Sequence, residues 1–228
     1  MNTESTAAPA WDLYREIHKA MRFALSGVVT LAGNTDAGDA EGVKRLLDEW
    51  QSVSFVLLGH HEHEDRYCDP LIQRCAPELR DELEAEHRRS DRAIEQLHAL
   101  AARLADARAT ERGALLQRLH LDLADFAAGY ARHLRYEEDR VMPALNRALS
   151  NDELAEVTMV IRTSVPPPDM CVFIRYMVPA MNFSERLDML GGMHAGAPPE
   201  IFEMFRAAAQ ACLPPQDYAA VAAAAGFA

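Results

Sequence analysis

The stretch that decides the fold reads His133-Leu134-Arg135-Tyr136-Glu137-Glu138-Asp139-Arg140-Val141-Met142-Pro143. An earlier stretch with the same spacing reads His60-His61-Glu62-His63-Glu64-Asp65-Arg66-Tyr67-Cys68-Asp69-Pro70. In each, a glutamate follows the first histidine by four residues and a proline closes the pattern. Residues four apart on a helix lie on one face, with Cβ atoms about 5–6 Å apart. Each stretch therefore places an imidazole beside a carboxylate, as a pair of metal ligands would be placed.

Four long segments carry apolar residues at alternating spacings of three and four, which predicts amphipathic helices. The segments span about 11–32, 41–70, 77–104 and 110–144. Turn residues such as Gly33 and Gly38 separate the first two, and Pro70 is expected to end or kink the second. Short connections between long helices predict an all-α fold, specifically an antiparallel up-down-up-down four-helix bundle.

Each of these four predicted helices has a histidine on its apolar stripe. They are His18, His60, His87 and His133. Two of them lie nine or ten residues after a proline near a helix start, and two lie ten residues before a proline near a helix end. At 1.5 Å of rise per residue, all four fall about 15 Å from the same end of an antiparallel bundle. One interior layer is thus expected to hold four imidazoles and the carboxylates of Glu64 and Glu137.

Such a layer needs compensating charge. Buried carboxylates without partners cost several kcal/mol each, or else take up protons. Divalent cations remove that cost, and six ligands are too many for one tetrahedral zinc. The set suits two metal ions with bridging glutamates, and imidazole with carboxylate but no thiolate suits iron, manganese or zinc.

On these residues the chain resembles the hemerythrin-like family, also called HHE cation-binding domains. The resemblance covers about residues 10–148 and rests on Ile17-His18-Lys19-Ala20-Met21-Arg22, Glu86-His87 and the two stretches quoted above. It implies two iron ions in a non-haem di-iron centre. The metal ligands it implies are His18, His60 and Glu64 on one side and His87, His133 and Glu137 on the other, with both glutamates as bridges.

The sequence departs from the oxygen-carrying members at one place. They have a fifth histidine one turn beyond the residue that matches His87, and this chain has Asp91 there. Reversible oxygen carriage is therefore in doubt, and His61, Glu62, Asp91, Glu138 or water is left open as the replacement. His61 itself lies off the apolar stripe and is expected at the surface.

Other candidate residues have simpler interpretations. His63 is expected at the surface, and His98, His120 and His194 are expected to be structural. Tyr67 and Tyr130 lie one turn from the ligands, as core residues or as hydrogen-bond donors to them.

Composition narrows the partners and the compartment. A net charge of −12 argues against nucleic acid and anionic membranes, and no apolar run approaches the ~18 residues of a membrane span. Residues 1–10 lack the apolar core of a signal peptide. The four cysteines lack CxxC spacing and are expected to be reduced thiols of a cytoplasmic protein.

The composition changes after residue 148, which predicts two units, 10–148 and a helical C-terminal extension at 149–228. Ser150 and Glu153 form a capping box, and further helices are expected at about 169–181, 184–193, 199–213 and 215–225. The extension is rich in methionine and proline and is expected to pack across the bundle. A lid over the site, or a homodimer surface, is the alternative.

These features favour a protein that binds or activates dioxygen or a related small oxidant such as nitric oxide or peroxide. Two other functions stay open. One is an oxygen, iron or redox sensor that signals through the extension. The other is an oxygenase whose organic substrate lies in a pocket formed by the additional helices.

Overall fold

The computed structural model describes residues 11–228, and within that range every regular element is helical. The prediction of an all-α fold is confirmed. Four helices are long: α1 (Arg15–Asn34), α2 (Ala40–His63), α4 (Pro77–Ala105) and α5 (Ala109–Tyr136). The prediction made for residues 1–10 lies outside the described part of the chain.

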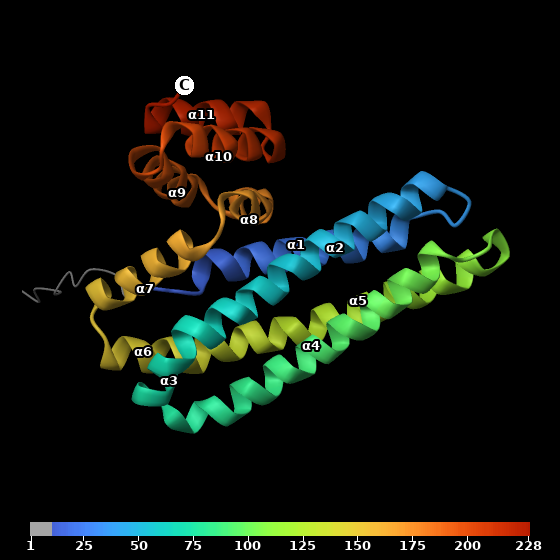
Figure 1. Cartoon of the computed structure of the whole chain (residues 1–228), viewed down its shortest axis with the longest axis horizontal. Helices are drawn as coiled ribbons and strands as arrows, with labels where there is room; N and C mark the ends of the chain where they lie inside the picture. The colour runs from blue at the N-terminus through green and yellow to red at the C-terminus, as the bar shows by residue number, and fades with distance from the viewer. Residues whose placement is uncertain (1–10) are drawn as a thin grey trace, which may run out of the picture.

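The four long helices lie side by side (Figure 1). α1 packs against α2 and α5, and α4 packs against the same two helices. The α1–α2 and α4–α5 loops lie at one end, and the α2–α4 connection lies at the other. Val28, Leu57, Ile94 and Leu119, one from each helix, are almost fully buried between them. Burying such a side chain stabilises the fold by about 1.5–3 kcal/mol.

Both His-x3-Glu stretches contain a π turn, Glu64–Cys68 and Glu137–Val141. The short helices α3 (Asp69–Cys75) and α6 (Met142–Ala148) follow directly. A proline has no N–H, and its ring clashes with the carbonyl four residues earlier in an α-helix. The wider turn, bonded over five residues, brings the chain past that clash. The helical path therefore continues through Pro70, and the predicted end or kink at this residue is replaced by a π turn before it. Glu64 and Glu137 are each the first residue of a π turn.

The first helix begins later than its apolar pattern predicts. The Asp12 carboxylate accepts hydrogen bonds from the backbone N–H groups of Tyr14 and Arg15, both at 3.0 Å, and this fixes the helix start. Trp11 consequently lies outside α1. Its indole N–H donates to Thr158 Oγ1 at 2.9 Å, in the C-terminal extension.

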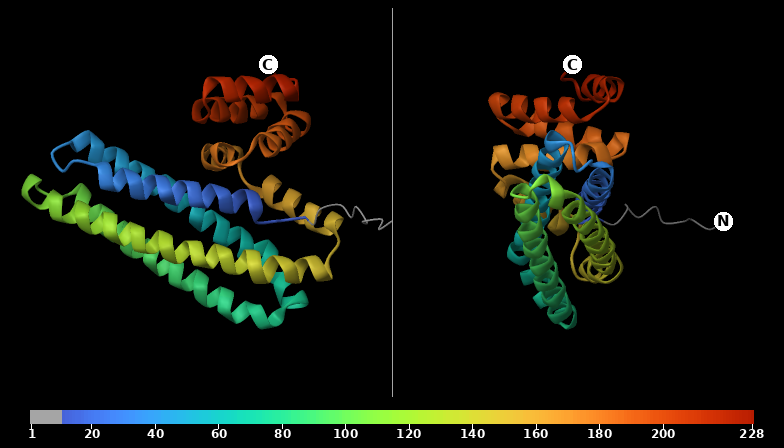
Figure 2. Two further views of the ribbon diagram at one scale, coloured as in Figure 1. Left: turned by 180° about the vertical axis from the view of Figure 1, so that it is seen from behind. Right: turned by 90° about the vertical axis from the view of Figure 1, so that its right-hand side faces the viewer.

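The extension consists of α7 (Asn151–Ser164), α8 (Pro167–Ala180), α9 (Phe183–Gly196), α10 (Pro199–Cys212) and α11 (Pro215–Ala225). The capping box predicted at Ser150 is present. Figure 2 shows these helices to one side of the long ones, where α8 packs against α1 and α2. The extension thus lies against the helices that carry the candidate site, and the boundary at residue 148 stays a prediction.

Among residues 11–228, no helix is both long enough and apolar enough to cross a membrane.

Candidate metal centre

Six side chains from four helical segments converge in the interior. They form two sets of four potential ligands, and within each set the ligand atoms lie within 4.8 Å of one another. One set is His18, His60, Glu64 and Glu137, and the other is Glu64, His87, His133 and Glu137. All six residues are buried, with exposed fractions of the whole residue between 0 and 8%. The two sets share both glutamates.

Each glutamate lies between a histidine of its own helix and one from another helix. Glu64 Oε2 is 3.3 Å from both His60 Nε2 and His87 Nε2. Glu137 Oε2 is 3.2 Å from His18 Nε2, and its Oε1 is 3.3 Å from His133 Nε2. The histidines of the layer are also close ring to ring: the His18 and His60 centroids are 5.4 Å apart.

These close approaches lack the geometry of hydrogen bonds. The buried atoms without a hydrogen-bond partner include Nε2 of all four histidines and Oε2 of both glutamates. Unsatisfied polar atoms are rare in protein interiors and each requires an explanation. Here the lone pairs point toward shared positions, as cations bound between them would require. The residues present therefore fit a pair of metal ions.

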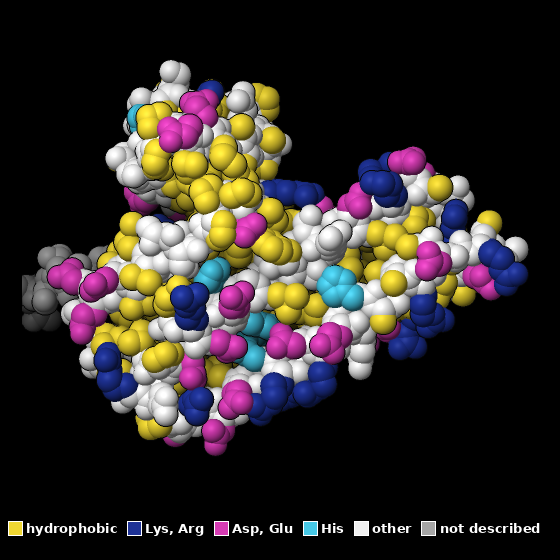
Figure 3. All heavy atoms as spheres, in the orientation of Figure 1, with side chains coloured by type: hydrophobic (Ala, Val, Ile, Leu, Met, Phe, Trp, Pro, Cys, Tyr) yellow, Lys and Arg dark blue, Asp and Glu magenta, His cyan; other side chains and the backbone are white. Residues whose placement is uncertain are grey.

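The opposite ring nitrogens of two histidines face carboxylates. His18 Nδ1 lies 3.0 Å from Glu138, which Arg22 holds through two bonds of 2.7 and 3.0 Å. His87 Nδ1 lies 3.2 Å from Asp65. A carboxylate behind a histidine fixes the ring orientation and increases the basicity of the nitrogen that faces the metal. In Figure 3, which has the orientation of Figure 1, histidine side chains are visible among acidic side chains near the middle of the molecule.

The histidines around Glu137 keep its carboxylate charged. Burial raises the pKa of Glu137, but the imidazoles of His18 and His87 outweigh burial and hold this pKa well below its usual range. Burial lowers the pKa of His18, yet Glu137 and Glu138 raise it to about 9. Burial lowers the pKa of His60. Glu137 is thus in its coordinating form at neutral pH, and a metal ion that binds His18 displaces a proton.

Comparison with known families agrees with this geometry. The family model of the hemerythrin HHE cation-binding domain matches residues 10–145. The chain belongs to the hemerythrin HHE cation-binding family. All six converging residues lie inside the matched range, and α7 to α11 lie outside it. No curated protein and no solved structure matches the chain.

One residue of this hemerythrin domain was wrongly expected at the surface. His61 is 3% exposed, and its ring stacks on His87 with centroids 4.6 Å apart. His61, His87 and His133 form a further group of potential ligands. Of the other proposed replacements for the fifth histidine, Glu62 is exposed. Asp91 and Glu138 lie behind histidines rather than among the converging atoms.

The environment of His61 explains its burial. Its Nδ1 lies 2.9 Å from Asp91, and its Nε2 lies 3.0 Å from the Tyr130 hydroxyl. The sequence contains a signal for this position, because Trp50, Ser54, Leu57 and His61 are spaced four, three and four apart. α2 buries two adjacent stripes, and the apolar stripe predicted for this helix is only one of them.

The remaining histidines are outside both sets of potential ligands. His63 is half-buried and stacks on Tyr67, so its expected exposure is only partly right. His98 packs against Trp50, and His194 packs against Phe202. His120 approaches the Val29 carbonyl through Nδ1 at 3.2 Å. These contacts suit structural roles.

Replacement of Tyr130 by phenylalanine is expected to destabilise the protein by about 1–3 kcal/mol, because the buried His61 Nε2 loses its hydroxyl partner. Metal content should not change, since Tyr130 is outside the two four-residue sets. Urea denaturation and metal analysis of the same sample measure both effects. Tyr67→Phe, at a half-buried ring, is the control and should change stability by less than about 0.5 kcal/mol. A large loss of metal in Tyr130→Phe would contradict this assignment.

Proposed function

We propose that the chain is a non-haem di-iron protein that binds or activates dioxygen or a related small oxidant, such as nitric oxide or peroxide. The proposed ligands are the six residues of the two sets, with Glu64 and Glu137 as bridges between the irons. The long helices would form an antiparallel up-down-up-down four-helix bundle around them.

The observation that carries this proposal is the sharing of both glutamates. Two separate metal sites would need separate ligands, whereas here each set is completed by the same Glu64 and Glu137. Two divalent cations would more than neutralise the two buried carboxylates and would accept lone pairs from the four imidazoles. Mixed imidazole and carboxylate ligands suit iron in the manner of the di-iron carboxylate proteins built in helix bundles.

When bound, a pair of ferrous ions supplies the electrons that reduce a small oxidant. The chain supplies the surroundings. Met21 and Tyr130 are both buried, the Tyr130 ring lies 5.5 Å from that of His133 between centroids, and the Tyr130 hydroxyl lies 3.5 Å from the Met21 sulfur. The contacts of His61 with Asp91 and with the Tyr130 hydroxyl lead from the half-exposed Asp91 into the interior and hold the His61 ring in place.

The proposal is tested by loading the chain with ferrous iron without air and then admitting oxygen. We expect the near-ultraviolet absorbance to change in wild-type protein and in His98→Ala, whose exposed ring packs on Trp50 far from the ligands. His133→Ala should show no such change. An unchanged spectrum of fully iron-loaded wild-type protein would contradict oxidant chemistry at this site.

A second candidate function, a sensor of oxygen, iron or redox state, is favoured by contacts on both sides of His18. Lys19 Nζ donates to the Glu185 carboxylate of α9 at 2.6 and 2.7 Å, and Glu16 pairs with Arg162 of α7. A shift of α1 on metal loss would therefore act on the extension through two ion pairs.

For a sensor, metal loading is expected to slow proteolysis of the extension several-fold, because α1 then holds α7 and α9 in place. Limited proteolysis of metal-loaded and metal-free protein, followed by mass spectrometry of the fragments, measures this. Lys19→Met, which removes one ion pair, should weaken the difference. Equal protection of the extension in both forms would contradict the sensor.

A further inference from the structure

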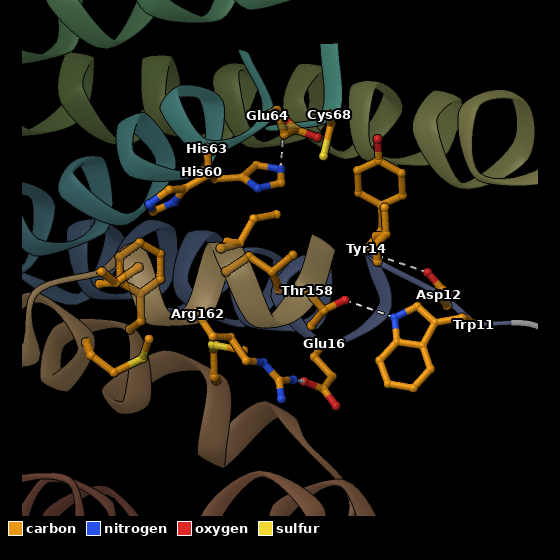
Figure 4. Close-up of a pocket in the computed structure, with 17 residues that line it drawn as sticks. Trp11, Asp12, Tyr14, Glu16, His60, His63, Glu64, Cys68, Thr158 and Arg162 are labelled. Atoms are coloured by element: carbon orange, nitrogen blue, oxygen red, sulfur yellow. Dashed lines mark hydrogen bonds and ion pairs between the residues drawn. The ribbon is translucent and has the colours of Figure 1, made fainter. Parts of the chain in front are cut away.

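A cavity of about 120 Å³ separates the metal centre from the C-terminal extension (Figure 4). Its inner end is formed by His60 and Glu64 of the proposed centre, together with Cys68. At the opposite side, the Trp11 indole meets Thr158, and Arg162 pairs with Glu16. The cavity therefore runs from the outer edge of α1 and α7 to the ligands themselves.

Between its two ends the cavity has apolar walls. They include Ile17 of α1, Ile161 of α7, and Met170, Phe173 and Met177 of α8. The three α8 residues are buried, and methionine side chains adapt to the shape of what they contact. Most of these wall residues belong to the extension, which lies outside the match to the family. The cavity is thus a feature that the extension adds to the hemerythrin domain.

The chemistry of the walls selects what can occupy the cavity. A buried water needs two to four polar partners, whereas an apolar cavity of about 150 Å³ stays dry and binds benzene. The present cavity has a similar size, and between its ends His63, whose ring packs on Phe173, is the polar side chain beside the apolar walls. Dioxygen would fill a small part of it.

A second cavity reaches the centre from the α3–α4 side and has the opposite character. Its volume is about 230 Å³, and Asp65, Asp69, Arg80 and Glu84 line it together with His87 and both glutamates. Cations and small polar species are suited to this charged approach. The apolar cavity is therefore not needed as their route.

We propose that the apolar cavity binds a small apolar organic molecule, of about six to eight non-hydrogen atoms, next to His60 and Glu64. Its position beside a metal pair rests on the proposed function, while binding in the cavity depends only on the walls. The molecule would contact α8 and α1 at once, so the extension would determine which compounds reach the centre.

Calorimetric titration of the full-length iron-loaded chain with toluene tests the proposal. We expect saturable binding of one toluene per chain. Ile161→Phe fills the cavity and should weaken binding by at least roughly tenfold. Val160→Phe, on the exposed side of the same helix, adds a ring of the same kind and should leave the affinity within about twofold.

A second filling variant, Ile17→Phe, covers the case in which Ile161→Phe does not fold, as judged by its circular dichroism and melting temperature. Absence of saturable binding to wild-type protein, or binding that persists in the folded filling variants, would overturn the proposal. Metal content measured on the same samples separates the two claims. Toluene binding without iron would contradict the di-iron function alone, and iron without toluene binding would contradict the cavity proposal alone.

Discussion

Replacement of Glu137 by alanine is expected to abolish stoichiometric metal binding. Its carboxylate, like that of Glu64, belongs to both four-residue sets, and it lies 3.2 to 3.7 Å from ring nitrogens of His18, His87 and His133. Without it, the two proposed metal positions lose one of their two bridges, and three imidazoles lose the negative charge beside them. His133→Ala should have the same effect on metal content, because it removes a ligand of the second set.

Metal analysis after anaerobic loading with ferrous iron and removal of unbound metal measures the effect. Asp139→Ala is the matched control for Glu137→Ala, since Asp139 is an exposed carboxylate in the same π turn. His98→Ala is the control for His133→Ala. Both controls should bind as much iron as wild-type protein. Full iron content in Glu137→Ala would contradict the bridging role assigned to this residue.

Removal of the metal is expected to lower the melting temperature by roughly 8–16 °C. A ligand present at a thousand times its dissociation constant stabilises the folded state by about 4 kcal/mol, and each kcal/mol shifts the midpoint by about 2–4 °C in a domain of this size. The physical reason is that the buried lone pairs of the layer, which have no hydrogen-bond partners, lose the cations that they would bind.

Differential scanning calorimetry before and after treatment with a chelator, and again after return of ferrous iron, gives this shift. The melting temperature should recover when iron is restored. His133→Ala should melt at the same temperature with and without chelator, because it has no metal to lose. A wild-type midpoint that does not respond to the chelator would show that the layer is stable by itself.

Much of the candidate site could be predicted from the sequence because helical geometry is local. The four-residue spacing of His60 and Glu64, and of His133 and Glu137, determines that each pair shares a helix face. The π turns could not be predicted in the same way. They depend on how the backbone before Pro70 avoids a clash with the proline ring. The spacing of apolar residues does not show whether the helix ends, kinks or widens into a π turn there.

Burial of His61 was missed because it depends on more than one neighbour. A residue off the main stripe of α2 is buried only when a second face of the helix is also covered, here by contacts with Tyr130 and His87. The capping box at Ser150 predicted the start of α7. Long-range packing determines which faces of α7 and α8 contact α1. The cavity between them therefore could not be predicted from the sequence.

Iron quantitation on the 228-residue chain shows whether the interior layer of ligands holds two iron ions. The protein is loaded with excess ferrous iron without air, freed of unbound metal and analysed for iron, zinc and manganese per chain. We expect about two irons per chain, one for each of the two sets of four ligands. Zinc alone, or no tightly bound metal, would contradict it.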